Sequence, residues 1–162
     1  PNINSRTLDN ASKLVALGAR REEIVQNLYR NRSLATLKLW GQALAHLKHD
    51  NQIGLVSLNL TKQDFLASGA TPNDLPEIID ELIVNSPEAK IIVLLYETNQ
   101  AVEGIISVNR GLDAAALVKP FNPEGTKERA KIIIKNKDIV AAEKEVIENI
   151  VKIMKQTNIR NG

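Results

Sequence analysis

The segment 122–129 gathers residue types that can hold a phosphate group. Gly125 has no Cβ, so a ligand can approach the backbone amides closely, and Thr126 adds a hydroxyl donor. Lys127 and Arg129 supply cations that form charge-assisted hydrogen bonds to phosphate oxygens. These residue types make the segment a candidate anion-binding loop.

Two other residues of the same segment work against anion binding. Pro123 has no amide hydrogen to donate, and the carboxylate of Glu124 repels anions. Runs of charged residues are also commonly solvated surface. Two interpretations follow: an altered anion-binding site, or an ordinary polar loop with solvated charges.

A second candidate lies where an expected strand ends. Asn109 closes that strand, which spans residues 102–109, and Arg110 follows it directly. The planar guanidinium of Arg110 could clamp a phosphate through its fork of N–H donors, or it could lie in solvent. If the domain binds phosphate, we expect the ligand between Arg110 and the segment 125–129.

Other constellations are too incomplete for catalysis. His46 and His49 stand three residues apart in an expected helix, but zinc would need a third protein ligand. Glu143 and Glu145 are expected on an exposed helix face. No nucleophile elbow or Walker-type loop is present, and cysteine is absent. We therefore assign no catalytic residue and no metal ligand to this chain.

A basic cluster in the first quarter of the chain could meet an acidic partner or nucleic acid. Glu22 and Glu23 dilute it, and a solvated helical face is the simpler interpretation. The cluster consists of Arg20, Arg21, Arg30, Arg32 and Lys38.

The elements that must position these residues begin with three expected helices. The first starts near Thr7 or Asn10 and stops at Gly18, and the second carries Glu22 and Glu23 in its first turn. Ser33 caps the third, which is expected to run to residue 50. Its apolar stripe is typical of core packing and consists of Leu34, Leu37, Trp40, Leu44 and Leu47.

After residue 50 the pattern alternates between strands and helices. Apolar runs predict strands at 53–60, 89–97, 102–109 and 130–135. The short link 98–101 predicts an antiparallel hairpin. Caps and apolar spacing predict helices after Thr61, at 74–84, at 113–118 and from Asp138 to about residue 156. The last residues are expected to fray.

This order predicts an α+β fold, in which an N-terminal helical segment precedes a mixed β-sheet flanked by helices. We expect a helical connecting segment at 1–50 and an α/β substrate-binding domain at 51–162. The chain starts with Pro1 rather than Met, which indicates a segment of a longer protein.

Composition narrows the class of protein. The 162 residues are 43% hydrophobic and 25% charged, which is ordinary for a globular domain. A net charge of +2 and an aromatic content of 3% argue against tight, non-specific binding to nucleic acid. The absence of cysteine and of any apolar stretch long enough to span a bilayer leads us to expect a cytoplasmic protein without membrane contact.

The second half resembles the C-terminal, DHH-associated substrate-binding domain of DHH-family phosphoesterases, such as oligoribonuclease/pAp-phosphatase and RecJ-like proteins. In that family a strand bearing a Ser-Leu-Arg-Ser-like motif precedes a short helix, a glycine–histidine loop, a strand and a final helix. The matching segments here are GIISVNR (104–110), DAAALVKPF (113–121), NPEGTKERAK (122–131), IIIKNKD (132–138) and the helix 140–154. The first helices also match the family's connecting region through Leu14–Ala19 and LKLWG (37–41).

The chain departs from the family pattern at the loop. Thr126 stands where the family has histidine, Arg129 and Lys131 stand where it has alanine and glycine, and Gly125 alone remains of the glycine run. Asn109 stands where the motif arginine is expected, with Arg110 adjacent. The family's metal ligands, on Asp-x-Asp and Asp-His-His motifs of a preceding domain, have no counterpart in this chain.

The resemblance implies a domain that recognises nucleotide or nucleic-acid phosphate for a metal-dependent phosphoesterase. By carry-over, the substrate-binding residues are Asn109, Arg110, Gly125, Thr126, Lys127 and Arg129. The isolated chain would be inactive, and the parent hydrolase would hold a divalent metal ion, taken as manganese, in its catalytic DHH domain. Its partners would be a nucleotide or short oligonucleotide and that domain, with a homodimer left open. The alternative is a non-catalytic structural or regulatory interaction domain with a degenerate loop.

Overall fold

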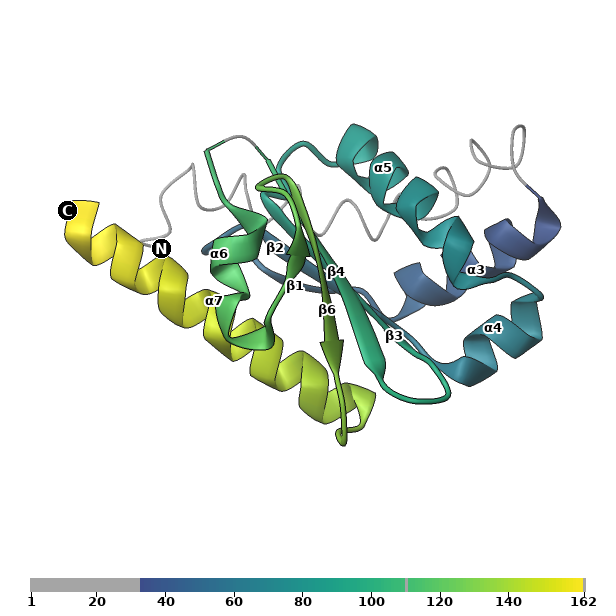
Figure 1. Ribbon diagram of the computed structural model, residues 1–162. Helices are drawn as coiled ribbons and strands as arrows, with labels where there is room; N and C mark the ends of the chain where they lie inside the picture. Colours follow the sequence, from purple (N-terminus) through teal and green to yellow (C-terminus); the bar gives the residue numbers. More distant parts are fainter. Residues whose placement is uncertain (1–32, 110, 162) are drawn as a thin grey trace, which may run out of the picture.

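A six-stranded mixed sheet forms the centre of the computed structural model, which describes residues 33–109 and 111–161 (Figure 1). The two helices expected before residue 33, most of the basic cluster, and Arg110 lie outside the described residues. The strands, in their order across the sheet, are β1 (Lys48–Asp50), β2 (Leu55–Leu60), β3 (Ile91–Glu97), β4 (Val102–Val108), β6 (Arg129–Ile134) and β5 (Glu124–Gly125).

Strand direction follows from the length of each connection. β2 and β3 are parallel, and the chain between them forms α4 (Lys62–Ser68), a short 3-10 helix (Pro72–Asp74) and α5 (Leu75–Asn85). β3 and β4 are antiparallel and are joined by the short link that the sequence predicted to be a hairpin. The remaining neighbours, β1 with β2, β4 with β6 and β5 with β6, are also antiparallel.

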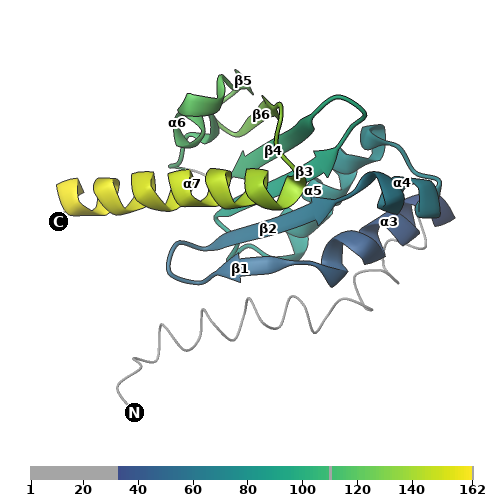
Figure 2. The same ribbon diagram turned by 90° about the horizontal axis from the view of Figure 1, so that it is seen from below.

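Helices cover the two faces of the sheet separately (Figures 1 and 2). On one face, α3 (Leu34–Ala45) and α5 pack with α4 on apolar side chains of β2 and β3, around the fully buried Trp40. On the other face, α6 (Ala114–Leu117) and α7 (Ile139–Asn161) cover β3, β4 and β6. The last turns of α7 extend beyond the sheet. The predicted α+β fold, with a mixed sheet flanked by helices, is confirmed.

The third predicted helix is shorter than its apolar stripe suggested. α3 ends at Ala45, where the backbone N–H of His46 turns back to the carbonyls of Ala43 and Leu44. The next residues form β1, in which His49 pairs with Val56 across the ladder. His46 and His49 therefore do not share a helical face, because pairing with a neighbouring strand replaced the last turns of the expected helix.

Two further boundaries differ from prediction. The loop 122–129 contains the short strand β5, which pairs with β6, and it is preceded by a 3-10 helix at Lys119–Phe121. The last helix starts as expected, since the carboxylate of Asp138 accepts the N–H of Ala141. That helix runs to Asn161, past the predicted end near residue 156.

Glu143 was predicted to be solvated, and this was wrong. Among the residues that the structure describes it is the one buried charged residue, with 3% of its surface exposed. Its carboxylate accepts a hydrogen bond from the Ser57 hydroxyl at 2.8 Å and contacts the Lys48 ammonium at 2.5 Å. Helical spacing turns Glu143 toward the sheet together with Ala142 and Val146, which are also buried.

α3 ends before residue 50 and packs on the sheet, and β1, which ends at Asp50, is one of the strands of the sheet. The division of the chain into a helical connecting segment at 1–50 and a substrate-binding domain at 51–162 stays a prediction. Among the helices that the structure describes, none combines the length and the apolar character needed to cross a bilayer.

Candidate ligand-binding site

The side chains of β6 that point away from α6 and α7 include two cations. Ala130, Ile132 and Ile134 are buried against α6 and α7, so the alternation of a strand turns the intervening side chains to the other face. This second row consists of Arg129, Lys131 and Ile133. We call the side of β4 and β6 that bears this row the open face, because Lys131 and Ile133 are exposed there.

A pocket of about 360 Å³ lies between the open face and the start of α5. Tyr96 and Ile105 are almost fully buried beneath it, and Pro72 and Pro76 stand at its helical side. The remaining lining residues are Asn73, Glu124, Gly125, Arg129, Ala130 and Lys131. We call this pocket the Tyr96 pocket. One part of its lining is apolar, whereas the part along β5 and β6 presents charged groups.

Gly125 lines the Tyr96 pocket and lies where β5 and β6 approach each other closely. Its φ is +130°, and a Cβ at this position would lie 2.3 Å from the carbonyl oxygen of Arg129. The same carbonyl accepts the backbone N–H of Thr126 at 2.8 Å. Gly125 thus allows a tight hairpin that sets the direction of β6, which is a structural reason for glycine beside any role toward a ligand.

Tyr96, Lys131 and Glu103 form a small polar group on the open face. The Lys131 ammonium lies 3.5 Å from the Glu103 carboxylate and within hydrogen-bonding reach of the Tyr96 hydroxyl. Burial raises the pKa of the Tyr96 phenol, Glu103 raises it further, and Lys131 opposes both effects. The pKa of Lys131 is raised as well, first by the Tyr96 phenolate, against the opposing effect of burial and with help from Glu103.

These three residues predict that the pKa of Tyr96 lies above the ordinary value for tyrosine. In a Tyr29→Phe chain, Tyr96 is the remaining tyrosine, and its titration by ultraviolet absorbance should lie above the ordinary pKa of 10.0. Because the folded state favours the neutral phenol, stability is constant below the unfolded pKa of about 10 and falls as pH rises above it. Glu103→Gln should lower the pKa of Tyr96 and Lys131→Met should raise it. Shifts of the same sign in both variants would contradict the arrangement.

Arg129 forms an ion pair across the open face. Its guanidinium donates to a carboxylate oxygen of Asp80 on α5 at 2.7 Å, and the side chains of Arg129 and Asp80 are 34% and 63% exposed. Each open-face cation thus has a carboxylate partner, Asp80 for Arg129 and Glu103 for Lys131. An incoming anion would have to compete with these carboxylates.

The structure places the remaining predicted site residues apart from the Tyr96 pocket. Thr126 and Lys127 lie in the β5–β6 turn, where the Thr126 hydroxyl accepts the Arg129 N–H and the Lys127 carbonyl accepts the Ala114 N–H. Asn109 is exposed after β4 and donates its N–H to the Lys90 carbonyl. Of the predicted set, Gly125 and Arg129 are brought together, and Arg110 lies outside the described ranges.

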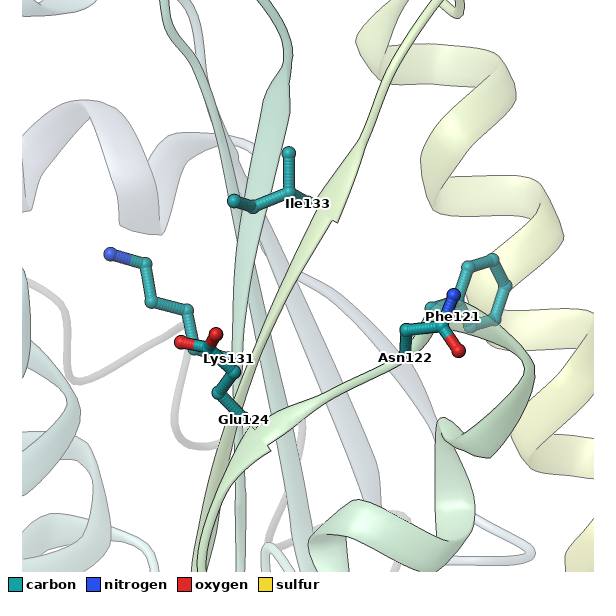
Figure 3. Close-up of a pocket in the computed structure, with 5 residues that line it drawn as sticks. All are labelled: Phe121, Asn122, Glu124, Lys131 and Ile133. Atoms are coloured by element: carbon teal, nitrogen blue, oxygen red, sulfur yellow. The ribbon is translucent and has the colours of Figure 1, made fainter.

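Two smaller pockets adjoin the same surface. One of about 270 Å³ is lined by Phe121, Asn122, Glu124, Lys131 and Ile133. Figure 3 shows that the Lys131 amine points away from Phe121 and Asn122. The other, of about 180 Å³, includes the buried Ser107 and the exposed Asn109 in its lining, and we call it the Ser107 pocket.

Sequence reasoning missed Tyr96, Lys131 and Asp80 as site residues. The alternation in β6 could have indicated Lys131, since it shares a face with Arg129. Tyr96 and Asp80 reach the site from β3 and α5, and no local pattern connects them with β6. Within residues 33–109 and 111–161, no three histidine, aspartate or glutamate side chains gather as a metal site would require.

Comparison with known proteins shows similarity in structure. No protein-family model and no curated protein sequence matches the chain. An exopolyphosphatase-related protein from Bacteroides fragilis superposes with a TM-score of 0.69 at 17% identity, over 95% of this chain and 45% of that protein. This chain thus spans less than half the length of that protein.

Two further solved structures match less closely. One is the pGpG-specific phosphodiesterase PggH from Vibrio cholerae, with a TM-score of 0.47 and 18% identity over 68% of this chain and 37% of PggH. The other is RecJ from Thermus thermophilus in complex with Mg²⁺, with a TM-score of 0.43 and 13% identity over 87% of this chain and 20% of RecJ. The chain shares its fold with part of the exopolyphosphatase-related protein from Bacteroides fragilis.

Proposed function

We propose that this chain is the substrate-binding domain of a DHH-family, metal-dependent phosphoesterase and that it recognises nucleotide or nucleic-acid phosphate on its open face. The observation that carries the proposal is the placement of Arg129 and Lys131. They stand two residues apart on the outward row of β6, and both line the Tyr96 pocket. An apolar floor with two cations at its edge suits a ligand that combines a ring with an anionic group.

The shared fold supports a longer protein in which catalysis and substrate binding belong to separate domains. This chain superposes on 45% of an exopolyphosphatase-related protein, so more than half of that protein lies outside the matched region. In our proposal, a preceding catalytic domain holds the divalent metal ion that activates water for phosphoester hydrolysis. This chain would bind the substrate and present its phosphate to that domain.

Calorimetric titration with a 5′-mononucleotide tests the phosphate site. Arg129→Met and Lys131→Met should each weaken binding about tenfold, because each removes one charge-assisted hydrogen bond, worth about 1.5 kcal/mol at the low end of the range. Lys152→Met removes the same charge from an exposed position on α7 and should leave the affinity unchanged. If the mononucleotide binds and neither open-face variant weakens it, the site lies elsewhere, and Arg110 and Lys127 become the residues to replace next.

A second candidate function is an interaction domain without a ligand of its own. The observation in its favour is that Arg129 and Lys131 already face carboxylates, while the neighbouring Ile133 is 53% exposed. Paired charges around an exposed apolar residue also suit a protein interface. Absence of mononucleotide binding, together with concentration-dependent self-association that Ile133→Lys abolishes, would favour this function over phosphate recognition.

A further inference from the structure

β6 has a free edge where β5 stops short. β4 pairs with the whole of β6, whereas β5 pairs with Ala130 and Lys131. The Arg129 carbonyl accepts the Thr126 N–H on the β5 side. Because backbone groups point alternately to the two edges of an antiparallel strand, the N–H and C=O of Ile133, four residues after Arg129, point to that same side. Within residues 33–109 and 111–161, no strand pairs with Ile133 there.

The chain leaves the line of β5 just before it would reach Ile133. If the register of β5 and β6 continued, Asn122 would lie opposite Ile133. Asn122 instead has a left-handed φ of +53° and donates its N–H to the Lys119 carbonyl. Figure 3 shows the chain toward Asn122 diverging from β6. The pocket of about 270 Å³ that Phe121, Asn122 and Ile133 help to line, which we call the Phe121 pocket, therefore adjoins the unpaired backbone of Ile133.

The side chains along this edge alternate between cation and apolar residue. Lys131 and Ile133 are exposed on the open face, and the exposed Lys135 follows at the same spacing. Lys131 already has Glu124 opposite it in the ladder, whereas no carboxylate of the described residues forms an ion pair with Lys135. A strand that continued the line of β5 would suit the edge best with an apolar side chain opposite Ile133 and a carboxylate opposite Lys135.

We infer that the free edge of β6 binds an extended acidic segment of a partner protein as an additional strand, antiparallel to β6. One residue of that segment exchanges both backbone hydrogen bonds with Ile133 and places an apolar side chain in the Phe121 pocket. An acidic residue two positions earlier in the segment meets Lys135. The main-chain bonds supply affinity and the two side chains supply preference for the partner. Neither Arg129 nor the Tyr96 pocket takes part, so the inference does not depend on the phosphate site.

A second copy of this chain fits the same edge less well. Two β6 strands that paired antiparallel about Ile133 would bring Lys131 of each copy opposite Lys135 of the other. Like charges directly opposite destabilise a strand pair. β5 also occupies the edge at Lys131, which leaves residues 132–134 of β6 for such a pairing. An acidic segment meets neither obstacle.

NMR titration of the ¹⁵N-labelled 162-residue chain with the peptide acetyl-Thr-Thr-Glu-Thr-Phe-amide tests the inference. We expect a Kd of about 1 mM or lower and slower hydrogen exchange at the Ile133 amide. N-methylation of the peptide's Phe should abolish binding, because it removes the N–H that donates to the Ile133 carbonyl. N-methylation of the Thr just before it is the matched control, since that N–H would point away from β6 and binding should be unchanged.

Charge is tested from both sides of the contact. Lys135→Met should weaken binding of the acidic peptide about two- to fivefold, the effect of losing one exposed ion pair. Lys155→Met removes the same charge from an exposed position on α7 and should leave the affinity unchanged. A peptide with Lys in place of its Glu should bind more weakly than the acidic peptide.

Three results would overturn the inference. The first is no change at the Ile133 amide with about 5 mM acidic peptide, well above the expected Kd. The second is an equal effect of the two N-methyl groups, because binding would then not use the strand edge. The third is concentration-dependent self-association through Ile133 in place of peptide binding, which would make a second copy the occupant.

Discussion

Lys48→Met should lower the free energy of unfolding by about 3 kcal/mol, the lower end of the range for breaking a buried ion pair. Lys48 on β1 contacts the carboxylate of Glu143 on α7 at 2.5 Å. The side chain of Glu143 is 4% exposed, whereas that of Lys48 is 60% exposed. Methionine would leave Glu143 bonded to the Ser57 hydroxyl without the ammonium, so a buried negative charge would lose its compensation. Water can reach the place that the amine leaves, which keeps the loss near the lower limit.

Chemical denaturation of four variants separates the ion pair from other effects. Lys144→Met removes the same charge from an exposed position on α7 and should change stability by no more than about 0.5 kcal/mol. The double variant Lys48→Met, Glu143→Leu should recover part of the loss of Lys48→Met, because no buried charge remains. Glu143→Leu alone should cost less than Lys48→Met, since the remaining ammonium can be hydrated. Equal losses for Lys48→Met and Lys144→Met would show that Glu143 does not need its partner.

Gly125→Ala should cost about 3 kcal/mol of stability and should also weaken any ligand binding that depends on Arg129. A φ of +130° is strained for a residue with a Cβ, which costs about 1–3 kcal/mol. The added methyl would lie 2.3 Å from the Arg129 carbonyl oxygen, so the backbone of β5 or β6 must move as well. Forcing such a shift adds about 1–3 kcal/mol. Because Arg129 is the residue displaced, stability and binding should change together.

Gly111→Ala is the control that isolates backbone strain. Gly111 also has a positive φ, +91°, but a Cβ there would meet no atom within 4 Å. We expect Gly111→Ala to cost about 1 kcal/mol, the strain contribution alone. Thermal unfolding of both variants gives the comparison. If Gly125→Ala is no less stable than Gly111→Ala, the close approach of β5 and β6 does not constrain this hairpin.

The sequence alone determined the elements whose signals are local. Apolar runs marked the buried strands β2, β3 and β4, and a four-residue link marked the β3–β4 hairpin. Side-chain caps marked the helix starts, because each cap oxygen accepts a backbone N–H three residues later. The structure confirms these caps at Ser33, Thr61 and Asp138. In all these features the interacting residues are near neighbours in sequence, so their pattern is visible there.

Tertiary structure decided the features that depend on residues far apart. β1 exists because Lys48–Asp50 pairs with β2, and this pairing outweighed the helical pattern of the preceding residues. Glu143 is buried because Lys48 and Ser57, more than 80 residues away, neutralise and bond it. Neither partner can be inferred from the spacing of charges on α7.

The residues of the candidate site also fall into two groups, those that the sequence predicted and those that only the tertiary structure placed. The sequence placed Gly125 and Arg129 beside a possible anion, from residue types within one short segment. It could not place Tyr96 beneath Arg129 and Lys131, or Asp80 across from Arg129, because β3 and α5 reach that surface through the crossover and the order of strands in the sheet. Residue types fix which chemistry a side chain can do, whereas the pairing of Arg129 with Asp80 is set by a distance that the packing of α5 on the sheet determines.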